Sequence, residues 1–119
     1  MGEGLLNVTP ESSGGALVLR VEGELDLSTC EELEAAIREA EGSNPPTLVL
    51  DLSGVTFLDS MGLGTLVKAD ERARAQGRRL LLVAPPEPAA RVFRITVLDE
   101  RFQFVDSLAG ITEAEPPKA

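Results

Sequence analysis

The sequence predicts a single α/β domain built on a mostly parallel sheet with an antiparallel edge strand. Segments with strand patterning alternate with segments of helical periodicity, in the order β-β-α-β-α-β-α-β-α. Two short runs, Thr47–Leu52 and Arg79–Val83, are almost wholly apolar, which is typical of parallel strands buried on both faces. The chain has 119 residues and no internal repeat, which leaves no room for a second domain.

The first two strands are expected at Leu5–Val8 and Ala16–Glu22. In the second of these, apolar residues recur at every other position from Leu17 to Val21, so one face is expected to be well buried. The loop Glu11–Gly15 between the two strands is short. The pair is therefore expected to be antiparallel, because a short loop cannot make a parallel crossover.

A first helix is expected to begin at Ser28 and to stop at Gly42. Glu31 follows Ser28 by three residues, which is the pattern of a capping box. The apolar residues at helical spacing are Cys30, Leu33, Ile37 and Ala40. Pro45 and Pro46 then break the chain before the central strand.

A second helix is expected at Ser60–Gln76, ended by Gly77, and a third begins within Pro85–Pro88 and carries Val92, Phe93 and Val97. A short edge strand follows at Phe102–Val105, and Asp106 is placed to cap a final short helix. The domain is therefore expected to span residues 1–112. Residues 113–119 form an acidic, proline-containing end that is expected to be a flexible tail.

Composition excludes several classes of function. The chain has no histidine, so Ser-His-Asp and Cys-His catalysis and histidine-based zinc sites are excluded, and no metal or cofactor is expected. The net charge of −9 opposes binding to nucleic acid. A lone cysteine, Cys30, cannot form an intramolecular disulfide. No signal-peptide pattern and no stretch of about 20 apolar residues is present, so we expect a cytoplasmic protein without membrane contact.

The segment after the central strand, DLSGVTFLDSMGLGTLV at 51–67, is the most informative. The strand is expected to end near Leu52, and Asp59-Ser60 follows a short loop at the start of the next helix. Sites in open α/β sheets form at the carboxyl ends of strands. A hydroxyl at a helix start lies where free N–H groups favour negative charge. Taken alone, however, a serine or aspartate at this position is most often only a helix cap.

Two further features lie near this segment. Gly62 and Gly64 weaken the first turns of the helix, which is explained if a partner or a neighbouring strand approaches the backbone closely. The loop Gly23-Glu24-Leu25-Asp26 follows the second strand. If that strand is parallel to the central one, Asp26 comes out at the same end of the sheet and could face Ser60; otherwise it is a solvated turn carboxylate.

Together, GELDLST at 23–29 and DLSGVTFLDSMGLGTL at 51–66 resemble the STAS family of bacterial anti-sigma factor antagonists, and the element order matches over nearly the whole chain. The resemblance implies a regulator of transcription that is not itself an enzyme. The unphosphorylated form binds an anti-sigma factor, an ATP-dependent serine kinase, and thereby releases a sigma factor. Phosphorylation on the serine that matches Ser60 switches binding off, and a metal-dependent serine phosphatase resets the protein.

The resemblance also implies a set of residues around the phosphorylation site. Asp26 and Asp59 match acidic residues of the family near the phosphoserine. Many relatives carry Ser or Thr where this chain has Met61, which bears on the identity of the partner. The residues expected to form the partner-binding environment of Ser60 are Asp26, Ser28, Asp59, Met61, Gly62 and Leu63.

Other functions fit the sequence less well. The nearest alternative is a STAS module that binds a partner or small ligand without being phosphorylated. An acyl carrier protein also attaches its prosthetic group to a D-S serine at a helix start. Its fold, however, is a helical bundle, whereas the apolar runs of this chain are typical of buried strands. A receiver domain phosphorylated on Asp51 lacks the acidic pair after its first strand, and an esterase elbow lacks both its glycine and a histidine.

Overall fold

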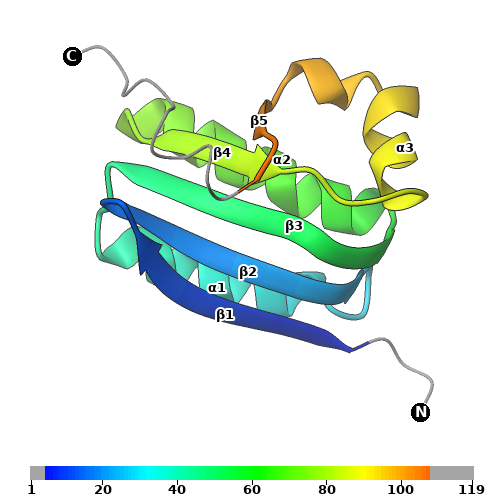
Figure 1. The fold of residues 1–119 in the computed structure, drawn as a ribbon, viewed down its shortest axis with the longest axis horizontal. Helices are drawn as coiled ribbons and strands as arrows, with labels where there is room; N and C mark the ends of the chain where they lie inside the picture. The colour runs from blue at the N-terminus through cyan, green and yellow to red at the C-terminus, as the bar shows by residue number, and fades with distance from the viewer. Residues whose placement is uncertain (1–4, 108–119) are drawn as a thin grey trace.

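The computed structural model describes residues 5–107 and contains one five-stranded mixed sheet (Figure 1). The strands are β1 (Leu6–Ser13), β2 (Ala16–Leu25), β3 (Thr47–Leu58), β4 (Arg79–Val83) and β5 (Gln103–Val105). They lie side by side in the order of the chain. β1 is antiparallel to β2, and every other neighbouring pair is parallel. The predicted fold class, mostly parallel with one antiparallel edge strand, is confirmed.

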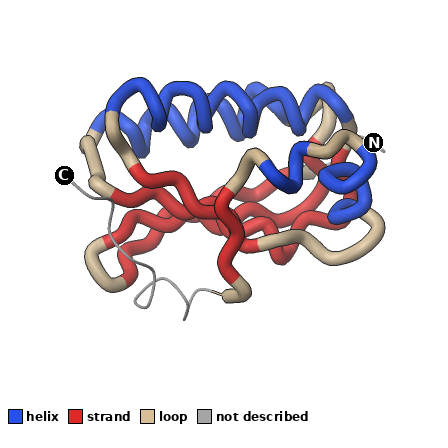
Figure 2. The backbone as a smooth tube through the Cα atoms, turned by 90° about the horizontal axis from the view of Figure 1, so that it is seen from above, coloured by secondary structure: helices blue, strands red, loops and turns tan. Residues whose placement is uncertain are grey.

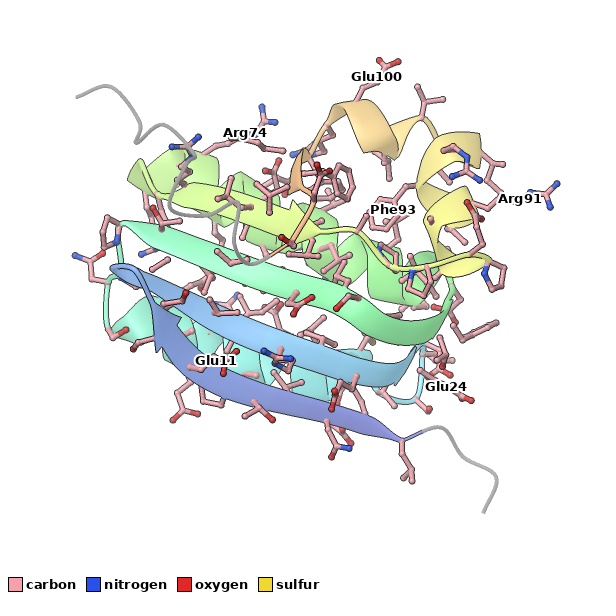
Figure 3. The ribbon with its side chains drawn as sticks, viewed as in Figure 1. Glu11, Glu24, Arg74, Arg91, Phe93 and Glu100 are labelled. Atoms are coloured by element: carbon pink, nitrogen blue, oxygen red, sulfur yellow. The ribbon has the colours of Figure 1, made fainter. Side chains whose placement is uncertain are left out.

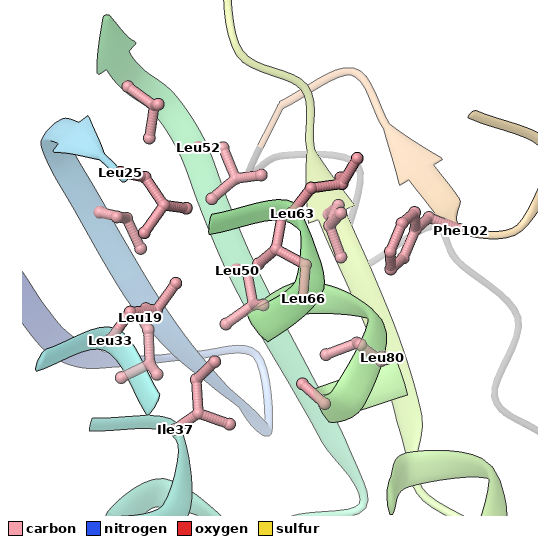
Figure 4. Close-up of a cluster of buried hydrophobic side chains, with 14 of the residues drawn as sticks. Leu19, Leu25, Leu33, Ile37, Leu50, Leu52, Leu63, Leu66, Leu80 and Phe102 are labelled. Atoms are coloured by element: carbon pink, nitrogen blue, oxygen red, sulfur yellow. The ribbon is translucent and has the colours of Figure 1, made fainter. Parts of the chain in front are cut away.

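All of the described helices lie on one face of this sheet (Figure 2). They are α1 (Cys30–Gly42), α2 (Ser60–Gln76), α3 (Ala89–Ile95) and a 3-10 turn (Leu98–Glu100). The main core fills the space between sheet and helices, and Figure 4 shows its leucines from β2, β3 and α2. Its fully buried side chains include Leu19, Leu25, Leu33, Ile37, Leu48, Leu50, Leu52, Leu66, Leu82 and Phe93. Burial of these apolar side chains is the main source of stability.

The first three strands are longer than the sequence predicted. β1 continues through the expected loop to Ser13, so that only Gly14 and Gly15 turn the chain, both with positive φ. β2 continues through the expected loop to Leu25, and β3 continues from Leu52 to Leu58. The register between β2 and β3 shifts twice along this extension. At each shift β3 has one extra, unpaired residue that bulges, and the two strands pair again beyond it.

The predicted start of the first helix was wrong. α1 begins at Cys30 with Thr29 at its N-cap, and no side chain caps it. The expected capping box does not form because the Ser28 hydroxyl donates to Asp26 Oδ1 instead, at 2.8 Å. Short polar side chains often bond to local backbone and turn groups in this way, in competition with helix capping.

The later elements agree with the sequence more closely. α2 has the predicted bounds, and Gly77 ends it in the left-handed conformation. α3 begins only after Pro88, and Val97 lies beyond its end with φ 60°, which corrects the expectation that this residue belongs to the helix. The helix expected after Asp106, the end of the domain at residue 112 and the tail 113–119 lie outside the described residues.

Candidate functional site

The carboxyl ends of β2 and β3 bring the two singled-out loops together. Leu25 and Leu58 are register partners in this parallel pair. One residue further on, the Asp59 N–H donates to Leu25 O at 3.2 Å. The loop after β2 and the start of α2 therefore emerge at the same edge of the sheet, as expected for parallel strands. We call this the carboxyl edge; it lies at the right of Figure 1.

Asp59 is the residue that joins the two loops. Its Oδ1 accepts a hydrogen bond from Gly62 N at 3.0 Å, which caps α2. Its Oδ2 accepts from Leu27 N at 3.2 Å, across 32 positions of sequence. One carboxylate thus satisfies a free N–H of the helix and one of the neighbouring loop, and it fixes the position of the first turn of α2.

Ser60 is the first residue of α2, and its side chain is exposed. No hydrogen bond joins its hydroxyl to another described residue. Because Asp59 provides the cap, the Ser60 hydroxyl is not needed for that purpose. It stands on the surface at a helix start, where free N–H groups and the helix dipole favour added negative charge.

The hydrogen bonds of Asp26 to the described residues lie within its own turn and none joins it to Ser60, so the expectation that it faces this serine stays a prediction. Asp26 Oδ1 accepts hydrogen bonds from the Ser28 hydroxyl at 2.8 Å and the Ser28 N–H at 3.0 Å, and Thr29 Oγ1 lies at 3.3 Å. These bonds, led by the one from the Ser28 hydroxyl, lower the pKa of the Asp26 carboxyl. Asp26 is therefore an ionised carboxylate within its own turn, on the same edge as Ser60.

Gly62 and Leu63 face inward. A Cβ added to Gly62 would lie 2.6 Å from Leu25 O, so the close approach expected at this glycine is made by a neighbouring strand. A Cβ on Gly64 would have nothing within 4 Å, so close approach does not explain that glycine. Leu63 is 4% exposed and belongs to the main core, where Figure 4 shows it on α2. The expectation that Leu63 contacts a partner is therefore corrected.

Sequence reasoning missed two apolar side chains on this surface. Leu27 is 66% exposed and Phe57 is 47% exposed, and Met61 beside Ser60 is 49% exposed. A shallow pocket of about 120 Å³ adjoins Phe57 and is lined by Pro88, Ala89 and Val92 of the α3 region. The run Phe57-Leu58 before Asp59 was the signal that could have revealed an exposed apolar side chain. In a strand, neighbouring side chains point to opposite faces, so only one of these two can enter the core.

Charged groups also lie on this side of the molecule. Figure 3 shows Glu24 at the end of β2 and Arg91 on α3 at the same side of the molecule. With Asp26 and Asp59 nearby, the edge close to Ser60 is mainly acidic. Among residues 5–107, no three carboxylate or cysteine side chains gather as metal ligands would. No helix in the described part of the chain is long and apolar enough to cross a membrane.

These features define a small α/β domain that presents one unengaged serine on a broad, mixed apolar and acidic surface. Comparison with known proteins assigns this domain to a family. The model of the STAS domain family matches residues 7–111. The chain belongs to the STAS domain family.

Individual relatives agree with this assignment. The chain is 37% identical over 110 residues to the anti-sigma-F factor antagonist RsfB of Mycobacterium tuberculosis, and the match covers 89% of each chain. It is similar to the crystal structure of an anti-sigma factor antagonist from Mycobacterium paratuberculosis (TM-score 0.81, 30% identity, 92% and 96% of the two chains). The unphosphorylated form of the anti-sigma factor antagonist SpoIIAA shares the fold, with a TM-score of 0.74, 23% identity and coverage of 90% and 95%.

Proposed function

We propose that this chain is an anti-sigma factor antagonist, and that phosphorylation of Ser60 by an anti-sigma factor kinase switches its binding off. The observation that carries the proposal is the exposed Ser60 hydroxyl, which no described residue engages, at the first position of α2. The names of the relatives support the antagonist function, since RsfB is itself an anti-sigma-F factor antagonist. The protein acts in the cytoplasm as a substrate of other enzymes.

The unphosphorylated protein would bind through the surface around Ser60. Leu27, Phe57 and Met61 all expose large apolar side chains at the carboxyl edge. Burying apolar surface stabilises a complex by about 25 cal/mol per Å², before the costs of association. The acidic groups Asp26 and Asp59 at this edge favour a partner surface that is basic around an apolar centre, because complementary charges guide docking.

The phosphorylation step transfers the γ-phosphoryl group of ATP to Ser60. The serine Oγ forms a bond to the γ-phosphorus, the bond to the β-phosphate oxygen breaks, ADP leaves and the hydroxyl proton passes to a base of the kinase. The kinase supplies ATP and its metal ion. A metal-dependent serine phosphatase would hydrolyse the phosphoserine and restore the hydroxyl.

The phosphate acts mainly by changing charge. It adds about −1.5 to −2 charges beside the carboxylate of Asp59. The helix N–H groups offset this repulsion by about 0.3–1 kcal/mol at an exposed helix start, so the domain itself is not expected to refold. A partner that covers Ser60 would have to bury an unpaired dianion, which costs far more. Blocking one surface is therefore sufficient to release the partner.

The test uses a cognate anti-sigma kinase and ATP, with phosphate located by mass spectrometry and affinity measured by calorimetry. We expect one phosphate, on Ser60, and binding weakened about tenfold or more, equivalent to about 1.4 kcal/mol. Ser60→Ala should bind without being phosphorylated, and Ser60→Asp should bind weakly. Ser43→Ala is the matched control, because Ser43 is an exposed serine at the other end of α1, and this variant should be phosphorylated and bind like the parent chain.

Two results would contradict the proposal. Unchanged affinity after complete phosphorylation would exclude the switch. Binding of the anti-sigma factor with no phosphate on any residue would favour the alternative, a STAS module that binds its partner without being phosphorylated.

A further inference from the structure

Four arginines gather around one pocket where α2 ends and the chain enters β4. The whole chain has only eleven lysines and arginines and a net charge of −9, so this pocket is a positive site in an acidic protein. Its volume is about 180 Å³. We call it the arginine pocket, and its polar lining residues are Asp70, Arg74, Arg78, Arg79, Arg101 and Gln103.

The arginine pocket lies far from the surface around Ser60. It adjoins the last turns of α2 and the first residues of β4 and β5. From Ser60 to Gln76, a helix such as α2 rises about 25 Å. Figure 3 shows Arg74 on the side of the molecule away from Glu24. A ligand in this pocket would therefore leave the surface around Ser60 open.

Arg78 is a buried cation whose described partners are all neutral. The residue is 8% exposed. Its guanidinium donates to Pro45 O at 3.0 Å, to Gln76 Oε1 at 2.8 Å and to Asn44 Oδ1 at 3.2 Å. These bonds hold the turn after α2 against the loop before β3, but none of them neutralises the charge. Buried charges in proteins are normally paired with an opposite charge, because removing an ion from water is costly.

The other three arginines share one carboxylate. Asp70 Oδ2 accepts from Arg74 Nε at 2.9 Å and from Arg101 Nε at 2.8 Å. Asp70 thus fixes both guanidinium groups but neutralises only one of the two charges. Arg79 is partly buried, and no carboxylate in the described part of the chain lies within ion-pairing distance of it.

The opposing charges near the pocket are fewer. Asp70 is the only carboxylate among its described lining residues. Glu71 does not line the pocket, and its Oε2 lies 3.8 Å from Arg101 Nη2. The carboxyl end of α2 adds about half a negative charge, although one of its carbonyls, Ala73 O, already accepts from Arg78 N at 2.9 Å. Four guanidinium charges exceed these opposing charges, so the described groups leave the pocket positive.

We propose that the arginine pocket binds a phosphate group, either free phosphate or the phosphate of a small metabolite. Guanidinium groups bind both phosphate and carboxylate through paired hydrogen bonds. Phosphate fits this pocket better, because it brings about two negative charges and at least three acceptor oxygens, whereas a carboxylate brings one charge and two oxygens. Pockets that enclose larger ligands have volumes of about 300–1,000 Å³, so only the phosphate part would enter. This binding does not depend on phosphorylation of Ser60.

Calorimetry with pyrophosphate and the full chain tests the proposal. We expect saturable binding, and Arg79→Gln should weaken it about tenfold or more, equivalent to about 1.4 kcal/mol. This variant removes a charge from the pocket without removing a described side-chain bond. Arg91→Gln is the matched control, because Arg91 is an exposed arginine of α3 outside the pocket, and its affinity for pyrophosphate should equal that of the parent chain. Absence of saturable binding, or an equal loss in both variants, would overturn the proposal.

Backbone amide shifts in NMR spectra of the parent chain then locate the bound ion. Pyrophosphate should shift the amides of residues 77–81 and 101–103 and leave those of residues 60–63 unchanged. Shifts confined to residues 60–63 would overturn the proposal, because they would place the ion at the start of α2.

Two further ligands distinguish the sources of the phosphate group. Tighter binding of glucose 6-phosphate than of inorganic phosphate would support the proposal with a phosphorylated metabolite as ligand, and the reverse order would support it with the free ion. A polyglutamate peptide that binds the same residues more tightly than pyrophosphate would overturn the proposal, by showing that the pocket is a docking surface for an acidic protein.

Discussion

Helices α1 and α2 both begin at the carboxyl edge, but their first turns are held in different ways. Asp59 caps α2 through Gly62 N and reaches across to Leu27 N. α1 has no side-chain cap. Instead the buried Thr29 hydroxyl donates to Glu24 O at 2.7 Å, in the strand just before it. One helix start is fixed by a long-range contact and the other by a local one.

The two exposed serines of this edge differ accordingly. The Ser28 hydroxyl is bound to Asp26. The Ser60 hydroxyl is bound to no described residue, because Asp59 already provides the cap beside it. A serine at a helix start is available for chemistry only when another group does the capping. The following predictions test this difference.

The largest effect is expected from Gly62→Ala. The added methyl group would lie 2.6 Å from Leu25 O and 2.7 Å from Leu25 Cγ, so the helix start must shift. Overpacking of this kind costs about 1–3 kcal/mol in the free energy of unfolding. Gly64→Ala is the matched control: nothing lies within 4 Å of its added Cβ, and it should be neutral or stabilising by up to about 1 kcal/mol. Urea unfolding measures both, and equal effects would refute the close approach at Gly62.

A smaller effect is expected from Asp59→Ala. This change removes the cap of α2 and the link to Leu27 together, and loss of a cap costs about 1–2 kcal/mol. Asp59→Asn keeps one oxygen for Gly62 N–H but replaces the other with an amide group that cannot accept from Leu27 N–H, so its loss should be intermediate. Urea unfolding measures the free energy of unfolding of the parent chain and both variants, and so gives their order of stability. If Asp59→Ala were as stable as the parent chain, the inference that Asp59 stabilises the fold by bonding to both loops would be refuted.

The smallest effect is expected from Ser28→Ala, which removes the main hydrogen bond that lowers the pKa of Asp26. The pKa of this carboxyl should rise toward its ordinary value, as measured by NMR titration. A lowered pKa in the folded state stabilises the fold above the pKa of the unfolded chain, and that stability is lost as pH falls through the folded value. The parent chain should therefore exceed Ser28→Ala in stability near neutral pH and lose this advantage in acid. An unchanged Asp26 pKa in the variant would contradict the assignment.

Sequence patterns were sufficient where a feature depends on neighbours along the chain. The bounds of α2 followed from helical spacing and Gly77, and the order of strands and helices followed from their alternating periods. Asp59 and Ser60 were correctly placed at a helix start for the same reason. The local pattern at Ser28 led to a wrong prediction of a capping box, because a capping box and an Asp26–Ser28 turn use the same residue types.

Other features depend on contacts between distant segments, and no local pattern carries them. The extension of β3 to Leu58 depends on pairing with β2, which lies more than 30 residues earlier. The exposure of Leu27 and Phe57 and the burial of Leu63 depend on which side of each element meets the core. The order of the elements, the bounds of α2 and the helix start at Ser60 could thus be predicted from the 119 residues alone. Strand pairing and side-chain burial were decided by tertiary packing, because each is a property of two segments that meet only in the folded chain.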